Sequence, residues 1–160
     1  SLSLKGAGVR FLRDLLKSEI DHRNILNIIE AEAVGIDNDD ILEMLIPGGR
    51  LIPERAFSSI AAGGKNAALD ILRGANRFDM QEFEGALAES KSVNSLDPVI
   101  TWFNAREHAL LQRMSYLHPV SALPVVNYVA MKVQEVADLR LIVRGRLAGL
   151  PTEVLEAHIL

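Results

Sequence analysis

The sequence predicts an all-α protein built from helical modules. Apolar residues recur three and four positions apart along most of the chain, and no segment alternates apolar and polar residues for long enough to make a strand. Apolar residues make up 49% of the chain and aromatic residues only 5%, a mixture suited to helix packing. This composition can bury a core, so we expect one sizeable domain, or one domain and part of another.

The first part of the chain predicts one long helix and one short helix. Residues 4–34 carry apolar side chains at helical spacing, and Gly35 is a plausible stop. The acidic run "DNDD" at 37–40 predicts the start of a short helix that extends through Ile46. The tripeptide "PGG" at 47–49 then breaks the chain.

The middle of the chain predicts three further helices. Two short ones are expected near residues 54–61 and 65–73. Asp79, with Glu82 three residues later, matches a capping box and predicts a helix that extends to about Ser90.

The last part of the chain predicts two long helices and a short one. Asp97 followed by a proline is typical of a helix start, and this helix should end near Leu117. Residues 118–124 form a tight corner before a long helix over about 121–148. A short helix should begin at Pro151 and continue to the end of the sequence.

Two parts of the sequence resemble each other and form an internal repeat. Residues 21–46 align with residues 135–159, and both copies predict a long helix, a glycine stop and a short helix with an acidic start. The aligned pairs include Asn24 with Asp138, Ile25 with Leu139, and Gly35 with Gly149. We therefore expect residues 1–50 to be the C-terminal part of a preceding helical module and residues 51–160 to be a complete C-terminal module.

Composition narrows the range of functions. The formal net charge of −4 gives no broad basic surface for a nucleic-acid partner. The chain contains no cysteine, so disulfides and thiolate metal sites are excluded. No apolar run approaches the ~20 residues that a membrane helix requires, and the start of the sequence lacks a signal-peptide layout. We therefore expect that this chain does not cross the membrane.

The sequence gives little support for a catalytic or cofactor site. The segment "SSIAAGGKNA" at 58–67 has Ser59 and Asn66 where a phosphate-binding loop requires glycine and a hydroxyl residue, so we interpret it as a turn between helices. The histidines are scattered without zinc-site spacing, and "DNDDILE" lacks the glycine of a calcium loop. Glutamates on helices are expected to face solvent. We therefore predict a non-enzymatic protein without a metal or cofactor.

One arginine interrupts the apolar stripe of the helix predicted over 121–148. Arg140 has no acidic residue three or four positions away, and it lies among Val129, Val133, Val136, Val143 and Leu147. Because a buried guanidinium needs a partner, we expect Arg140 to pair with a carboxylate of a neighbouring helix, with Glu107 as the first candidate. The alternative is an arginine at a protein interface. Truncating a buried Arg140 should cost roughly 3–5 kcal/mol.

The neighbouring arginines are expected at the surface. Arg144 and Arg146 align with Glu30 and Glu32 in the first copy of the repeat, so the fold tolerates either charge at both positions.

Residues 118–156 closely resemble the C-terminal signature of the C subunit of archaeal A-type ATP synthases, a family that includes the d subunit of vacuolar ATPases. The pattern is a His-Pro-x-Ser corner, a proline-led long helix, an acid before Asn/Asp-Leu-Arg, then Ile-x-Arg-Gly and Gly-Leu-Pro. Residues 20–36 resemble an earlier module of the family, with Glu30 in place of an arginine. The matching positions in the C-terminal block are Glu135, Asp138, Leu139, Arg140, Arg144, Gly145 and residues 149–151.

This resemblance implies a non-catalytic subunit of the central stalk of a rotary ATP synthase. In that family three similar helical modules form a funnel of roughly twice this length, which acts as a socket between the soluble shaft and the membrane ring of ion-carrying subunits. The implied partners are the shaft subunits and the ring, and the implied location is the cytoplasmic face of the membrane. The candidate structural or interface residues are Glu135, Asp138, Arg140, Arg144 and Arg146.

Two other classes of function stay open on the residues alone. The first is a free-standing helical adaptor or regulatory domain that binds proteins without belonging to a rotor. The second is an enzyme whose site is assembled at the helix ends, because carboxylates need only meet in space.

Overall fold

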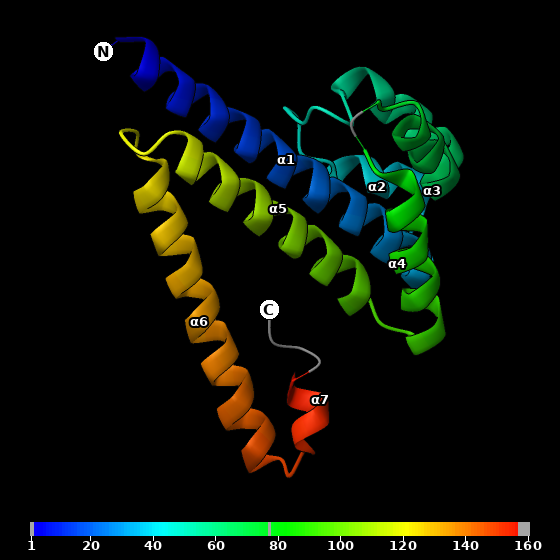
Figure 1. The fold of residues 1–160 in the computed structure, drawn as a ribbon. Helices are drawn as coiled ribbons and strands as arrows, with labels where there is room; N and C mark the ends of the chain where they lie inside the picture. Colours follow the sequence, from blue (N-terminus) through cyan, green and yellow to red (C-terminus); the bar gives the residue numbers. More distant parts are fainter. Residues whose placement is uncertain (1, 77, 157–160) are drawn as a thin grey trace. The chain divides into compact units, whose positions relative to one another are not determined.

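The computed structural model of the chain describes residues 2–76 and 78–156. Within those ranges every regular element is helical and there is no strand, which confirms the predicted all-α class (Figure 1). The elements are α1 (Leu2–Val34), α2 (Asn38–Met44), the 3-10 turn η1 (Glu54–Ala56), α3 (Phe57–Arg73), α4 (Met80–Val93), α5 (Asp97–Leu117), α6 (Leu123–Leu147) and α7 (Thr152–Glu156).

The predicted helices correspond to observed ones. The long helices expected over 4–34, 98–117 and 121–148 are α1, α5 and α6. The helix expected from Pro151 onward is α7, and the part of that prediction covering residues 157–160 lies outside the described residues.

The chain divides into two compact units. One comprises residues 9–103, and the other comprises residues 1–8 together with residues 104–160. This division follows spatial packing, and the module boundary that the sequence indicates near residue 50 stays a prediction.

The unit of residues 9–103 contains a continuous hydrophobic core. Buried aliphatic side chains come from every helix of the unit, among them Ile28 of α1 and Ile60 of α3. Aromatic rings close one part of this core: the ring centroids of Trp102 and Phe103 lie 5.0 Å apart, and those of Phe83 and Trp102 lie 5.5 Å apart. Apolar burial of this kind is the main driving force for folding.

A buried carboxylate on α1 binds the irregular segment that follows α2. Asp21 is 1% exposed, and its two oxygens accept hydrogen bonds from the backbone N–H groups of Arg50, Leu51 and Ile52 at 2.8, 2.8 and 3.0 Å. A Cβ atom on Gly49 would lie 2.3 Å from Asp21 Oδ1, so the backbone approaches this closely only because residue 49 is a glycine. The carboxylate thus satisfies amides that have no helix or strand partner.

An asparagine one turn further along α1 fixes the end of α2. The Asn24 side chain is fully buried, donates to the carbonyl oxygen of Ile46 at 2.9 Å and accepts from its N–H at 2.8 Å. Asn27 donates to the carbonyl oxygen of Met44 at 2.9 Å. These bonds hold the C-terminal end of α2 against α1.

The predicted signals in the middle of the chain are confirmed. Asp79 accepts a hydrogen bond from the Glu82 N–H at 3.2 Å and thereby caps the start of α4, which is the N-cap half of the predicted capping box. Gly64 has φ 56° and ψ −142°, which bends α3 into two helical stretches at the position where the sequence predicts a turn between helices. The neighbouring Lys65 forms an ion pair with Glu32 of α1.

The second unit contains the predicted corner and the helix pair α6–α7. Ser121 Oγ donates to the carbonyl oxygen of His118 at 2.7 Å and accepts from the Leu123 N–H at 3.1 Å, which closes the His-Pro-x-Ser corner. Further on, Gly145 of α6 is buried where Leu155 of α7 packs: an added Cβ would lie 2.2 Å from Leu155 Cδ2. A glycine here lets α7 fold back onto α6.

The two copies of the repeat share one helix-ending turn. Gly35 and Gly149 have φ values of 77° and 73°. The residue after each donates to a carbonyl five positions back, from Ile36 to Ala31 and from Leu150 to Gly145, both at 2.9 Å. Many helices end with such a turn, so it does not establish a duplication, which stays a prediction.

Replacing the buried carboxylate tests the role of Asp21. We expect Asp21→Ala to lower the free energy of unfolding by about 3 kcal/mol or more, because three backbone N–H groups lose their acceptor. The matched control is Asp14→Ala, which removes an exposed carboxylate of the same helix and should cost no more than about 0.5 kcal/mol. Urea denaturation measures both, and equal losses would contradict the assignment.

Candidate interaction site on α6

The five residues that the sequence selects all lie on α6. Glu135, Arg140, Arg144 and Arg146 are exposed, and Asp138 is half-buried. Pro124 in the first turn and Gly149 after the last turn delimit this helix, so its register is fixed by local sequence. The structure therefore places the selected residues on one rigid element, although they belong to different faces of it.

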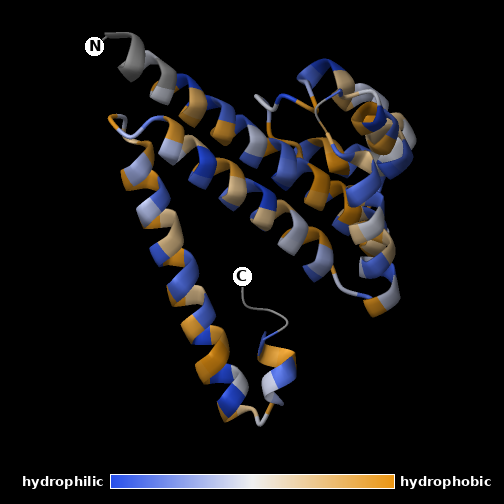
Figure 2. Ribbon diagram, viewed as in Figure 1, coloured by the Kyte–Doolittle hydropathy of each residue, from blue (hydrophilic) through white to orange (hydrophobic). Residues whose placement is uncertain are grey.

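The expectation that the apolar stripe of α6 is buried was wrong. The exposed fractions are 53% for Val129, 66% for Val133, 46% for Val136, 58% for Val143 and 84% for Leu147. Figure 2 shows hydrophobic residues recurring along the ribbon of α6. Helical spacing identifies a face, but it does not say that another element of the same chain covers that face.

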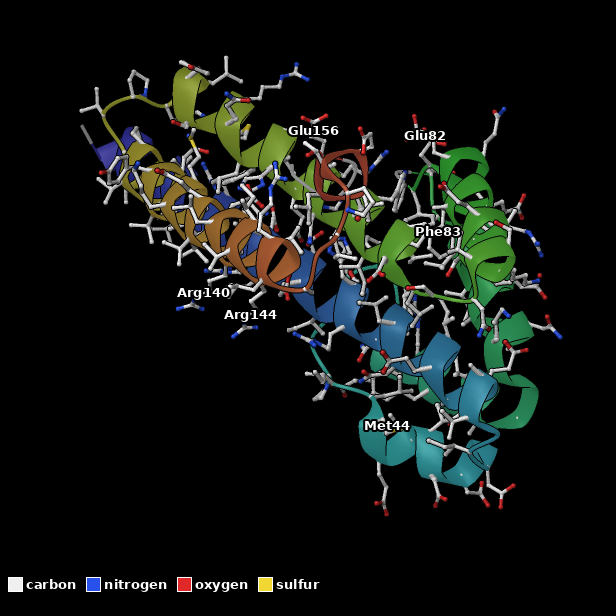
Figure 3. All side chains as sticks on the ribbon, turned by 90° about the horizontal axis from the view of Figure 1, so that it is seen from below. Met44, Glu82, Phe83, Arg140, Arg144 and Glu156 are labelled. Atoms are coloured by element: carbon white, nitrogen blue, oxygen red, sulfur yellow. The ribbon has the colours of Figure 1, made fainter. Side chains whose placement is uncertain are left out.

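The expected burial of Arg140 was also wrong. Its side chain is exposed, and the structure records no ion pair between it and Glu107 or any other described carboxylate. Figure 3 shows Arg140 and Arg144 extending from the same side of α6. The alternative interpretation of Arg140, as an arginine available at an interface, therefore fits this structure better than a buried structural pair.

A groove lies on another face of α6, between it and the part of α5 that belongs to the same unit. The groove has a volume of about 780 Å³. Ala105, His108, Ala109 and Gln112 of α5 line it, together with α6 residues that include Met131, Glu135, Asp138, Leu139 and Ile142. Two of the selected residues, Glu135 and Asp138, thus share this groove, whereas the three arginines do not line it.

The selected carboxylates of the groove are bound within their own helix. Glu135 accepts a hydrogen bond from Lys132 Nζ, and this bond raises the pKa of the Lys132 ammonium group above its usual value. Asp138 accepts a hydrogen bond from Gln134 Nε2 at 2.7 Å. These contacts orient the side chains without linking α6 to a distant segment.

The groove also holds a polar group that the sequence did not single out. Asn127 Oδ1 is buried and accepts no hydrogen bond from any described residue, while Asn127 Nδ2 donates to the Met131 sulfur at 3.7 Å. An asparagine in an amphipathic helix carries no signal of its own, so only the structure identifies Asn127 as part of the groove lining.

These features suit contact with other proteins. An exposed apolar face flanked by guanidinium groups matches the composition of protein interfaces, where arginine is enriched. Fold and site together define a helical scaffold with an exposed apolar face. Among the described residues, no helix is both long enough and apolar enough to span a membrane.

The chain belongs to the ATP synthase (C/AC39) subunit family, whose sequence model matches residues 2–158. It is 31% identical to the C subunit of the A-type ATP synthase of Haloferax volcanii over 157 residues, which cover 96% of this chain and 43% of that protein. It is 28% identical to the corresponding protein of Archaeoglobus fulgidus over 148 residues, covering 92% of this chain and 41% of that protein. The chain thus spans about two fifths of the length of these relatives. No solved structure gave a significant match.

The exposure of Arg140 leads to a direct test by truncation. Arg140→Ala should change the free energy of unfolding by no more than about 0.5 kcal/mol, as is usual for surface substitutions. Arg146→Ala, at another exposed position of the same helix, should behave alike. Chemical denaturation measures both variants. A loss of several kcal/mol for Arg140→Ala alone would support the buried ion pair of Arg140 instead.

Proposed function

We propose that this chain acts as a non-catalytic part of the central stalk of an A-type rotary ATP synthase. In this role it belongs to a socket that links the soluble shaft to the membrane ring of ion-carrying subunits and transmits torque between them. It works at the cytoplasmic face of the membrane as a peripheral component. Its partners are other subunits of the complex.

The observation that carries this proposal is the family match over nearly the whole chain. The relatives named above are C subunits of archaeal A-type ATP synthases. The structure supports the proposal in a second way, because α6 carries apolar side chains and arginines on an exposed face. A torque-transmitting part has to be held by its neighbours, and such a face offers both apolar area and charge for that contact.

Co-purification tests the proposed partners. The chain, immobilised on a resin, should retain the purified shaft subunits or the detergent-solubilised rotor ring of an archaeal A-type ATP synthase. A resin carrying an unrelated helical protein of similar net charge serves as the control. Retention above this control supports the rotor role. Failure to retain either component would contradict it and favour the helical adaptor.

Nucleotide titration tests the non-catalytic assignment. Calorimetry with magnesium-ATP should give no binding in the low-micromolar range, because "AAGGKNA" forms the bend of α3 and Lys65 is paired with Glu32. The chain should also release no phosphate from ATP. Saturable micromolar binding or turnover would contradict a purely mechanical role.

A further inference from the structure

The exposed face of α6 carries a heptad pattern. Its positions follow one another in steps of three and four residues, an average of about 3.5, which is the spacing of helices that wind around a partner helix. We call this set the α6 seam: Val126, Val129, Val133, Val136, Arg140, Val143 and Leu147. In heptad terms, Val126, Val133, Arg140 and Leu147 occupy the a positions and the other three occupy d.

The residue types of the seam favour a covered face. Five of its seven members are valine, a β-branched residue that lowers helix propensity and gains nothing from exposure on a solvent-facing helix. Yet every apolar member except Val126 is at least 46% exposed. Branched residues at a positions are favoured where two helices pack together. The α6 seam therefore has the residue types of a helix–helix contact, but its side chains are exposed.

The seam lies on a different side of α6 from the groove. None of its seven members lines the groove, which takes its α6 residues from the remaining heptad positions, such as Met131, Asp138 and Ile142. The side of α6 that lines the groove with α5 is therefore not the side of the seam, and a second helix can approach the seam without displacing α5.

The charges on the seam and its flanks are all positive. Arg140 lies in the seam, Arg144 and Arg146 occupy the flanking e and g positions, and none of the three is ion-paired with a described carboxylate. Lys132, the remaining flanking charge, is already paired with Glu135. The first half of the seam is therefore purely apolar, whereas the second half presents three uncompensated guanidinium groups.

We propose that the α6 seam docks an amphipathic helix of another protein that carries apolar residues along its contact edge and carboxylates opposite Arg140, Arg144 and Arg146. Charge complementarity selects this occupant, because carboxylates neutralise the guanidinium groups that a helix contact partly desolvates. A second copy of this chain is a poor occupant, since its own seam and flanking positions carry no carboxylate to pair with the three arginines. The arginine at an a position then sets the register of the pair.

A pair of synthetic helices tests the proposal. The probe is a fluorescein-labelled peptide of about four heptads, with leucine at a and d and glutamate at e and g; its twin carries lysine at e and g. Fluorescence anisotropy with the full chain should give saturable binding of the glutamate peptide and about tenfold weaker binding of the lysine peptide. Raising the salt concentration from about 50 to about 500 mM should weaken binding of the glutamate peptide.

Matched variants localise the binding. Arg140→Glu combined with Arg144→Glu should reverse the preference between the two peptides, and Val133→Asp should weaken both by about tenfold or more. Arg113→Glu changes an exposed arginine of α5 in the same unit and should leave the preference unchanged. Circular dichroism checks that each variant keeps its helical content, and the salt dependence of the unmodified chain provides the test should the double variant not fold.

Three results would overturn the proposal. The first is binding of neither peptide, and the second is equal binding of both. The third is a concentration-dependent dimer of the chain in sedimentation that Val133→Asp abolishes, since the occupant would then be a second copy. Any of these results leaves the co-purification outcome unaffected, because another surface of the chain can contact a rotor subunit.

Discussion

The arrangement of the unit of residues 9–103 depends on one buried side chain on α1. Asp21 supplies acceptors to three successive backbone N–H groups, and Asn24 holds Ile46 through both its donor and its acceptor. Irregular backbone is tolerated in a protein interior only where such partners exist. The segment between α2 and η1 can therefore lie against α1, and this places α3 where its apolar face joins the core.

Local sequence signals predicted the helices well because each signal acts within a few residues. The Asp79–Glu82 cap, the glycine turns at residues 35 and 149, and the bend at Gly64 depend on backbone conformation and on near neighbours. The role of Asp21 had no comparable signal. An aspartate within a polar stretch of a helix is expected to face solvent, and its partners lie about thirty positions away in sequence.

The environment of the candidate site could not be predicted from the sequence. The sequence directed attention to α6 and its arginines, and periodicity correctly identified one apolar face. That face is nevertheless exposed. Periodicity depends only on the residues of the helix itself, whereas burial depends on whether another segment covers the helix. The expected pair between Arg140 and Glu107 failed for the same reason. The groove with Asn127 is formed by residues of both α5 and α6, and no pattern within a single helix contains that information.

A comparison of aligned positions shows that polar side chains of α1 and α6 make different kinds of contact. In the predicted repeat, Asp21 and Asn24 of α1 align with Glu135 and Asp138 of α6. The α1 pair binds backbone groups of a distant segment, whereas the α6 pair accepts hydrogen bonds from side chains of its own helix. Polar groups that bind a distant segment fix a helix within its own unit. Those of α6 impose no such constraint, and this agrees with the proposed docking of a partner helix on its valines and arginines.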